Sequence, residues 1–147
     1  MLKNIIAIAV GMGDGLGAGD NTRAALITRG LSEITRLGIA LGGRAETFAG
    51  LTGMGDLIAT CTSPLSRNRH VGVELGKGRK LEEIVAAMHM VAEGVKSAPT
   101  VIALAEQHGI DMPISRDVFD VIQGTKTPVQ AFRGLTRTIA RSEAEAG

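Results

Sequence analysis

The chain has 147 residues, of which 44% are hydrophobic and 21% charged, the balance of a folded domain rather than of a disordered chain. A formal net charge of +1, from 16 basic and 15 acidic residues, excludes a broad basic surface for nucleic acid or an anionic membrane. Aromatic residues make up only 2%, with no Trp or Tyr, so the stacking surfaces used by most single-strand nucleic-acid binders are missing as well.

The first predicted element is an apolar run, residues 4–10, which fits either a strand or the start of a buried helix. The Gly-rich stretch GMGDGLGAGDN follows and matches the G-x-G-x-x-G/A dinucleotide fingerprint, with Glu33 at about the expected spacing of 20 residues. That fingerprint requires a strand, turn and helix within a parallel sheet, and no further strands follow. We therefore interpret the glycines as a bend that lets helices or a substrate approach closely.

The longest predicted helix covers residues 22–41, where apolar residues recur at intervals of three, four and seven positions. Asp20 or Asn21 is expected to cap its start, and Gly42 to end it. Shorter helices are predicted at residues 45–51, 55–62, 67–75, 81–90, 99–109, 115–124 and 127–141. No run is long enough to span a bilayer, so membrane insertion is not expected.

Two prolines are expected to mark helix starts. Pro99 suits a first turn, where no N–H donor is needed, and Ser97 is expected to cap that helix. Pro128 opens the last helix in the same way, and the apolar side of that helix can pack within the domain or meet a second subunit in a homodimer. Together the elements predict one all-α, bundle-like domain over residues 1–147, with a frayed polar tail at about 142–147.

Two segments carry a high density of reactive side chains, Leu2-Lys3-Asn4 and the stretch GMGDLIATCTSPLSRNR at residues 53–69. Each side chain alone has an ordinary interpretation. Lys3 would be a solvated charge, Asp56 an acid in the first turn of a helix, and Arg67 part of a solvated helix start.

Taken together, the same residues suit a more specific chemistry. Ser66, Arg67 and Asn68 at the start of a helix combine backbone donors, a guanidinium and an amide, which suit a phosphate group. A lysine within reach of an aspartate suits proton transfer. The set indicates a small phosphorylated carbonyl or alcohol substrate, provided that the two segments meet in the fold.

The motifs KN, DG-G-G-NT, GDL-TC, RN and VAEGV, in this order, resemble the substrate domain of NAD(P)-dependent glycerol-3-phosphate dehydrogenases. The resemblance covers essentially the whole chain. It implies a helical fold like the C-terminal domain of 6-phosphogluconate dehydrogenase, lacking the Rossmann domain that precedes it in the family. It also implies the interconversion of dihydroxyacetone phosphate and sn-glycerol 3-phosphate with NADH or NADPH, which feeds glycerophospholipid synthesis.

The resemblance implies roles for individual residues. Lys3 matches the acid/base that exchanges a proton with the C2 oxygen of the substrate, with Asp56 as its catalytic partner. The implied substrate-binding residues are Lys3, Asn4, Asp56, Thr60, Ser66, Arg67 and Asn68. The implied contacts to NAD or NADP are Arg67, Val91 and Glu93. The implied partner is the N-terminal nucleotide-binding domain, without which the isolated chain is expected to be inactive.

The alternative from another class is a non-catalytic helical module that dimerises or senses phosphate. The enzyme interpretation requires Lys3, Asp56 and Arg67 to lie in one cleft. The only cysteine, Cys61, excludes an internal disulfide, is expected to be a buried filler and fits a reducing cytoplasm. The three histidines have no ligand spacing, so no metal site is expected.

Overall fold

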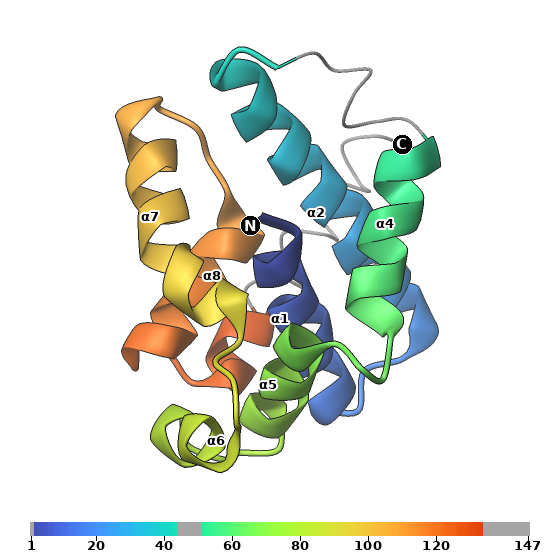
Figure 1. The fold of residues 1–147 in the computed structure, drawn as a ribbon, viewed down its shortest axis with the longest axis vertical. Coiled ribbons are helices and arrows are strands. Elements are labelled where there is room, and N and C mark those ends of the chain that lie inside the picture. Colours follow the sequence, from blue (N-terminus) through green and yellow to red (C-terminus); the bar gives the residue numbers. More distant parts are fainter. Residues whose placement is uncertain (1, 44–50, 134–147) are drawn as a thin grey trace.

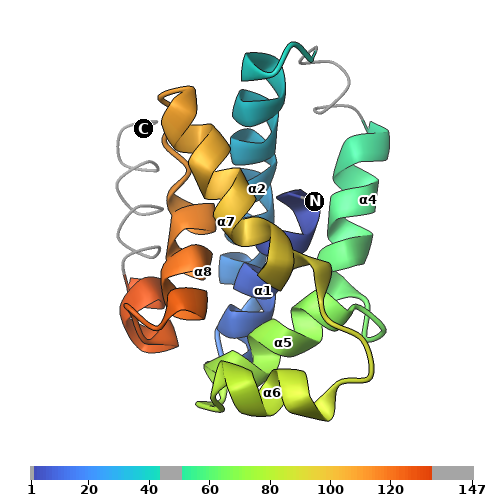
Figure 2. The ribbon, with the colours of Figure 1, turned by 60° about the vertical axis from the view of Figure 1, so that its left-hand side comes forward.

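The computed structural model describes residues 2–43 and 51–133, and within these residues every regular element is helical. The helices are α1 (Leu2–Gly15), α2 (Asp20–Ala40), α4 (Leu51–Thr62), α5 (Arg67–Gly76), α6 (Leu81–Ala87), α7 (Glu93–Gln107) and α8 (Pro113–Gln123). A further helical stretch begins at residue 128 and is described to residue 133. Figures 1 and 2 show α1 at the centre of the other helices. The predicted all-α class is confirmed.

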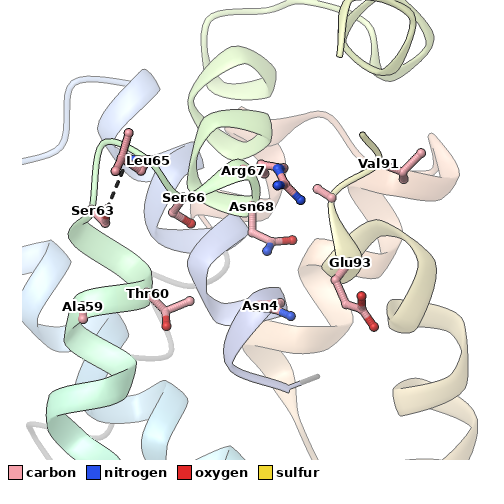
Figure 3. Close-up of a pocket in the computed structure, with 11 residues that line it drawn as sticks. Asn4, Ala59, Thr60, Ser63, Leu65, Ser66, Arg67, Asn68, Val91 and Glu93 are labelled. Atoms are coloured by element: carbon pink, nitrogen blue, oxygen red, sulfur yellow. Dashed lines mark hydrogen bonds between the residues drawn. The ribbon is translucent and has the colours of Figure 1, made fainter. Parts of the chain in front are cut away.

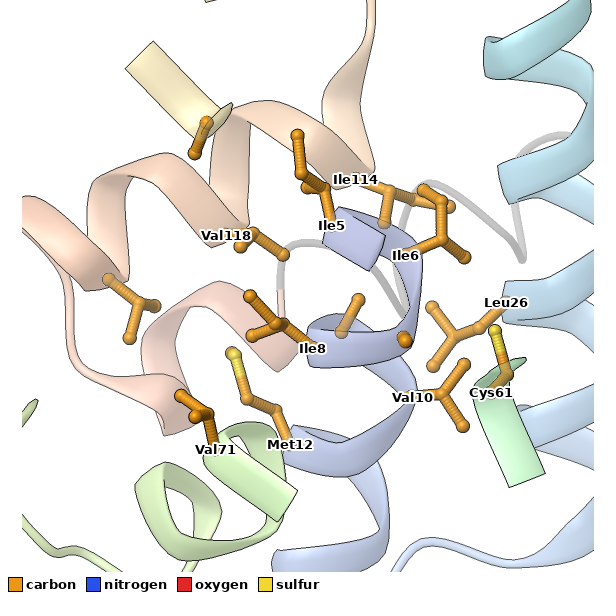
Figure 4. Close-up of a cluster of buried hydrophobic side chains, with 14 of the residues drawn as sticks. Ile5, Ile6, Ile8, Val10, Met12, Leu26, Cys61, Val71, Ile114 and Val118 are labelled. Carbon is orange, nitrogen blue, oxygen red and sulfur yellow. The ribbon is translucent and has the colours of Figure 1, made fainter. Parts of the chain in front are cut away.

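Helix α1 is the core of the domain. Its residues 5–13 are all buried, and it packs against α2, α4, α5, α7 and α8. In Figure 4, Ile8 points toward Val118 of α8, whereas Val10 points toward α2 and α4. A helix surrounded in this way must be apolar all round, so it has no polar face to give a helical period. For this reason the sequence pattern of residues 4–10 fits a strand as well as a helix.

Helices α1 and α5 make backbone contact through a glycine interlock, which we define as Gly11, Gly15, Gly72 and Gly76. A Cβ atom at Gly72 would overlap the carbonyl oxygen of Ile8, and the other three glycines likewise face backbone atoms of the opposite helix. The predicted close approach between helices is therefore confirmed. The expected bend is wrong for residues 11–15, because α1 stays helical through Gly15 to make these contacts, and the chain turns only at residues 16–19.

Several predicted helix boundaries shift in the structure. The N-cap of α2 is Gly19, in extended conformation, rather than Asp20 or Asn21. Asp20 lies in the first turn of α2, where its Oδ1 is 3.7 Å from the Arg23 Nη1. Two other helices begin earlier than predicted, α4 at Leu51 and α8 at Pro113, whose nitrogen carries no hydrogen to leave unpaired in the first turn. Helices α5 and α6 begin at Arg67 and Leu81, as predicted. Helix α6 ends at Ala87, three residues before the predicted end.

The start of α7 was predicted wrongly. The helix begins at Glu93, so Pro99 lies inside it rather than at its first turn. The Ser97 hydroxyl is also not a cap, because it donates back to the Glu93 carbonyl oxygen at 3.0 Å within the same helix.

Some predictions fall outside the described residues. These are the helix at 45–51, apart from Leu51 in α4, the frayed tail at 142–147, and the last helix beyond residue 133, for which pairing in a homodimer was one of two expected roles. In the part that the structure describes, no helix is both long and apolar enough to cross a membrane.

Glu33 links α2 to the start of α8. Its carboxylate is 1% exposed and accepts hydrogen bonds from the backbone N–H of Ile114 at 2.6 Å and of Ser115 at 3.1 Å. The Ser115 hydroxyl adds a third bond at 2.9 Å. Glu33 therefore satisfies the free N–H groups at a helix N-terminus. This internal role supports setting aside the dinucleotide fingerprint, in which Glu33 would hold a ribose.

Burial raises the pKa of Glu33 above its ordinary 4.5, although the hydrogen bonds from Ile114 and Ser115 oppose that shift. The Glu33 carboxyl therefore stays protonated to higher pH in the native state than in the unfolded state. As a result, the free energy of unfolding falls as pH rises between the unfolded-state and native-state pKa values. We expect the wild type to lose stability relative to Glu33→Gln as pH rises above the ordinary carboxyl pKa of 4.5. Urea unfolding on both sides of that value, with exposed Glu106→Gln as control, measures the difference. A pH-independent difference would contradict the assignment.

Candidate functional site

Lys3 and Asp56 form an ion pair between the first turn of α1 and the middle of α4. The Lys3 Nζ lies 2.9 Å from the Asp56 Oδ2. The two side chains are 42% and 57% exposed, so a ligand can reach both. Thr60 follows one turn later on α4, where its hydroxyl donates to the Asp56 carbonyl oxygen at 2.8 Å. The pair that was predicted for proton transfer is therefore assembled at an open surface.

A pocket of about 460 Å³ opens between the starts of α1, α5 and α7 and the end of α4 (Figure 3). The predicted site residues on its wall are Asn4, Thr60, Ser66, Arg67, Asn68, Val91 and Glu93. Lys3 and Asp56 lie beside it, since Lys3 directly precedes Asn4 and Asp56 precedes Thr60 by one helical turn. Arg67 lines this pocket, whereas Lys3 and Asp56 are not among its lining residues, so the requirement that all three share one cleft stays a prediction.

The pocket also includes residues that the sequence analysis missed. They are Ala59, Ser63, Leu65 and Ala92. Ser63 was predictable, because it lies three residues after Thr60 and directly follows the end of α4. Leu65 carried no sequence signal, yet it is 90% exposed at the pocket edge.

The N-terminus of α5 forms one wall. Ser66 is its N-cap, and the Ser66 hydroxyl oxygen accepts from the Arg69 N–H at 3.2 Å. Arg69 is not part of the pocket lining, because its Nη2 pairs with the Asp14 Oδ2 at 3.0 Å. The other oxygen of Asp14, Oδ1, pairs with the Arg23 Nη2 at 2.8 Å. Arg67 is exposed and makes no ion pair within the described residues. Of the two arginines, Arg67 is the one available to a ligand.

The N-terminus of α7 forms the facing wall. Its N-cap residue is Ala92, which has no side chain to accept a hydrogen bond. The Asn68 Oδ1 of α5 takes that part by accepting from the Gly94 N–H at 2.8 Å. Two helix N-termini thus meet at this pocket, and each contributes a partial positive charge. The site suits an anion although the protein has almost no net charge.

Two other classes of site find no support in the described residues. Burial raises the pKa of the Cys61 thiol to about 12, with a smaller contribution from the charge of Asp14. The thiol therefore stays protonated and is a buried filler, as predicted, rather than a nucleophile. In the described residues, no group of three or more His, Cys, Asp and Glu is arranged to hold a metal ion.

Residues 1–133 match the family model described as the C-terminus of NAD-dependent glycerol-3-phosphate dehydrogenase. The chain is 76% identical over all 147 residues to glycerol-3-phosphate dehydrogenase [NAD(P)+] 2 of Sphingopyxis alaskensis, covering 44% of that protein. It is 57% identical over 145 residues (99% of the chain) to glycerol-3-phosphate dehydrogenase [NAD(P)+] of Methylibium petroleiphilum, again covering 44%. The chain therefore spans less than half the length of these curated relatives.

Solved structures give the same result. The crystal structure of glycerol-3-phosphate dehydrogenase from Coxiella burnetii matches with a TM-score of 0.88 at 46% identity, over 92% of this chain and 42% of that one. The glycerol-3-phosphate dehydrogenase of Saccharomyces cerevisiae matches with a TM-score of 0.78 at 29% identity, over 88% of this chain and 38% of that one. The predicted all-α fold of this domain is confirmed.

Proposed function

Because this chain belongs to the family of NAD-dependent glycerol-3-phosphate dehydrogenase C-terminal regions, we propose that it is the substrate-binding and proton-transferring half of such an enzyme. The whole enzyme would interconvert dihydroxyacetone phosphate and sn-glycerol 3-phosphate. One observation carries the proposal: the Lys3–Asp56 ion pair adjoins a pocket that contains the free Arg67 at a helix N-terminus. A proton donor next to a pocket that suits a phosphate fits a small phosphorylated ketone.

Lys3 is the acid/base in this proposal. Its ammonium donates a proton to the C2 oxygen of dihydroxyacetone phosphate as that carbon is reduced, and the amine takes the proton back in the reverse direction. Asp56 orients the ammonium through the 2.9 Å contact and favours its charged form. Thr60 and Asn4 line the adjoining wall, where they can hydrogen-bond the hydroxyl groups of the substrate.

The nicotinamide cofactor, when bound, supplies the hydride that reduces C2. This chain offers it a small contact set at the pocket edge, consisting of Arg67, Val91 and Glu93. Val91 is 41% exposed and suits a planar ring, whereas the Glu93 carboxylate suits a ribose hydroxyl. These residues fit one side of NAD or NADP, and we propose that a separate nucleotide-binding domain holds the rest.

The wider assignments are also proposals. We place the enzyme in the cytoplasm, where a reducing environment agrees with the free thiol of Cys61, and in the supply of glycerol 3-phosphate for phospholipid synthesis. The alternative, a non-catalytic module that dimerises or senses phosphate, explains the pocket around Arg67. It gives no role to the exposed pairing of Lys3 with Asp56.

By itself the 147-residue chain is expected to show no dehydrogenase activity, because its described residues contain no strand and hence no parallel sheet for a dinucleotide. Oxidation of NADH in the presence of dihydroxyacetone phosphate measures this directly. Turnover that depends on the chain concentration would contradict the assignment of only half a site.

A hybrid enzyme allows the site to be tested in turnover. We define it as the Sphingopyxis alaskensis relative in which this chain replaces the matching 147 residues. In the hybrid, Arg67→Lys is expected to raise KM for dihydroxyacetone phosphate about tenfold or more, because the planar fork that grips two phosphate oxygens is lost. The control is His70→Ala, which removes a nearby exposed side chain and should leave KM unchanged. An unaltered KM in Arg67→Lys would exclude Arg67 from phosphate binding.

A further inference from the structure

Asn68 joins the two helix N-termini that form the pocket. It is 9% exposed in the first turn of α5, and its Oδ1 accepts from the N–H of Gly94, in the first turn of α7, at 2.8 Å. The N-cap of α7, Ala92, makes no side-chain cap of its own. Helix α7 is therefore capped by a residue from another helix, 26 positions earlier in the chain.

This contact determines which way the Asn68 amide faces. One end of an asparagine amide accepts hydrogen bonds and the other donates them. Turning the amide over would set its NH₂ group against the N–H of Gly94, so the oxygen stays on α7. Figure 3 shows the nitrogen end of Asn68 turned toward Asn4, on the pocket side. No hydrogen bond of Asn68 Nδ2 is present within the described residues, so this donor is free for a ligand.

The start of α7 is held tightly at this point. A Cβ atom on Gly94 would lie 2.9 Å from Asn68 Oδ1, 2.9 Å from the Asn4 carbonyl oxygen and 2.8 Å from Ile8 Cδ1. Helix α7 therefore contacts α1 and Asn68 with no space between them. Any shift of the Asn68 side chain must be transmitted to Gly94 and the neighbouring Glu93.

The family resemblance already implies that Asn68 binds the substrate, and a phosphate is the group that its Nδ2 suits. We propose that Asn68 also couples the two halves of the site, because its Oδ1 positions the start of α7. This inference rests on the proposed function, because Val91 and Glu93 immediately before Gly94 are the residues proposed to meet the cofactor. An anion on Nδ2 polarises the amide and strengthens the acceptor at Oδ1. Phosphate binding thereby reinforces the bond to Gly94 and fixes the segment that faces the cofactor.

The test is a titration of the isotopically labelled 147-residue chain with sn-glycerol 3-phosphate, followed by NMR at the backbone amides of Arg67 and Gly94. We expect both signals to shift with the same saturation curve, and hydrogen exchange at Gly94 to slow. Glycerol, which lacks the phosphate, should move neither signal. In Asn68→Ala, exchange at Gly94 without ligand should be about tenfold faster, the loss of roughly one hydrogen bond.

Asn68→Asp separates the two functions of the side chain. It keeps an oxygen for Gly94, so exchange there should match the wild type, but it replaces the donor with a negative charge and should abolish the response to sn-glycerol 3-phosphate. Wild-type binding by Asn68→Asp would overturn the proposal, and so would an Arg67 response without any response at Gly94. If neither amide responds in the wild type, the proposed substrate site itself fails, which is a distinct outcome.

Discussion

Lys3→Ala in the hybrid enzyme is expected to lower kcat by about 10² to 10⁴-fold, the usual contribution of a general acid, while KM for dihydroxyacetone phosphate changes little. The reason is that Lys3 lies beside Asp56 rather than on the wall proposed to bind phosphate, so its proton matters chiefly in the transition state. Steady-state rates of NADH oxidation over a range of substrate concentrations separate the two constants.

The control for this experiment is Lys96→Ala, which removes an exposed lysine on α7 and should leave both constants unchanged. Asp56→Asn should give a smaller loss of kcat than Lys3→Ala, because the ammonium remains but loses its orienting charge. A Lys3→Ala variant with unchanged kcat and raised KM would show that Lys3 only binds substrate and is not the acid/base.

Gly72→Ala is expected to lower the free energy of unfolding by about 2–4 kcal/mol, which is severe for a domain of this size. The added methyl group would overlap the backbone carbonyl oxygen of Ile8, which no side-chain rotation can move away. The clash outweighs the helix propensity gained on replacing Gly with Ala, about 1 kcal/mol. Urea unfolding followed by circular dichroism measures the change.

Gly55→Ala is the matched control. Gly55 lies within α4, and a Cβ atom added there would meet no neighbouring heavy atom within 4 Å. It should stabilise the chain by roughly 0.5–1 kcal/mol through helix propensity alone. If the Gly72 and Gly55 variants gave the same change, the glycine interlock would not be a tight backbone contact.

The elements that the sequence predicted well carry their own local start and stop signals. Helix α5 begins at Arg67, as predicted, directly after the capping Ser66, and Gly124, in left-handed conformation at φ 81°, ends α8. Helix α7 was misplaced because Asn68, from another helix, caps it, and no local pattern can reveal such a partner. Helix α1 stayed ambiguous because burial on all sides removes the amphipathic period.

The candidate site was predictable in its residue types but not in its assembly. Lys3 and Asp56 are 53 positions apart, and spacing alone could not show that they meet. Their grouping came from the resemblance to a known family. The division of labour between Arg67 and Arg69 was also beyond the sequence, because it depends on Asp14, which holds Arg69 away from the pocket.

The most direct measurement is the rate at which the hybrid enzyme oxidises NADH with dihydroxyacetone phosphate, because it asks whether this chain supplies a working half of an active site. The predicted result is turnover within about tenfold of the parent enzyme, a difference of less than 1.4 kcal/mol in the barrier. A hybrid that is folded and binds NADH, yet reduces no dihydroxyacetone phosphate, would contradict the assignment of this chain as the substrate-binding and proton-transferring half of the enzyme.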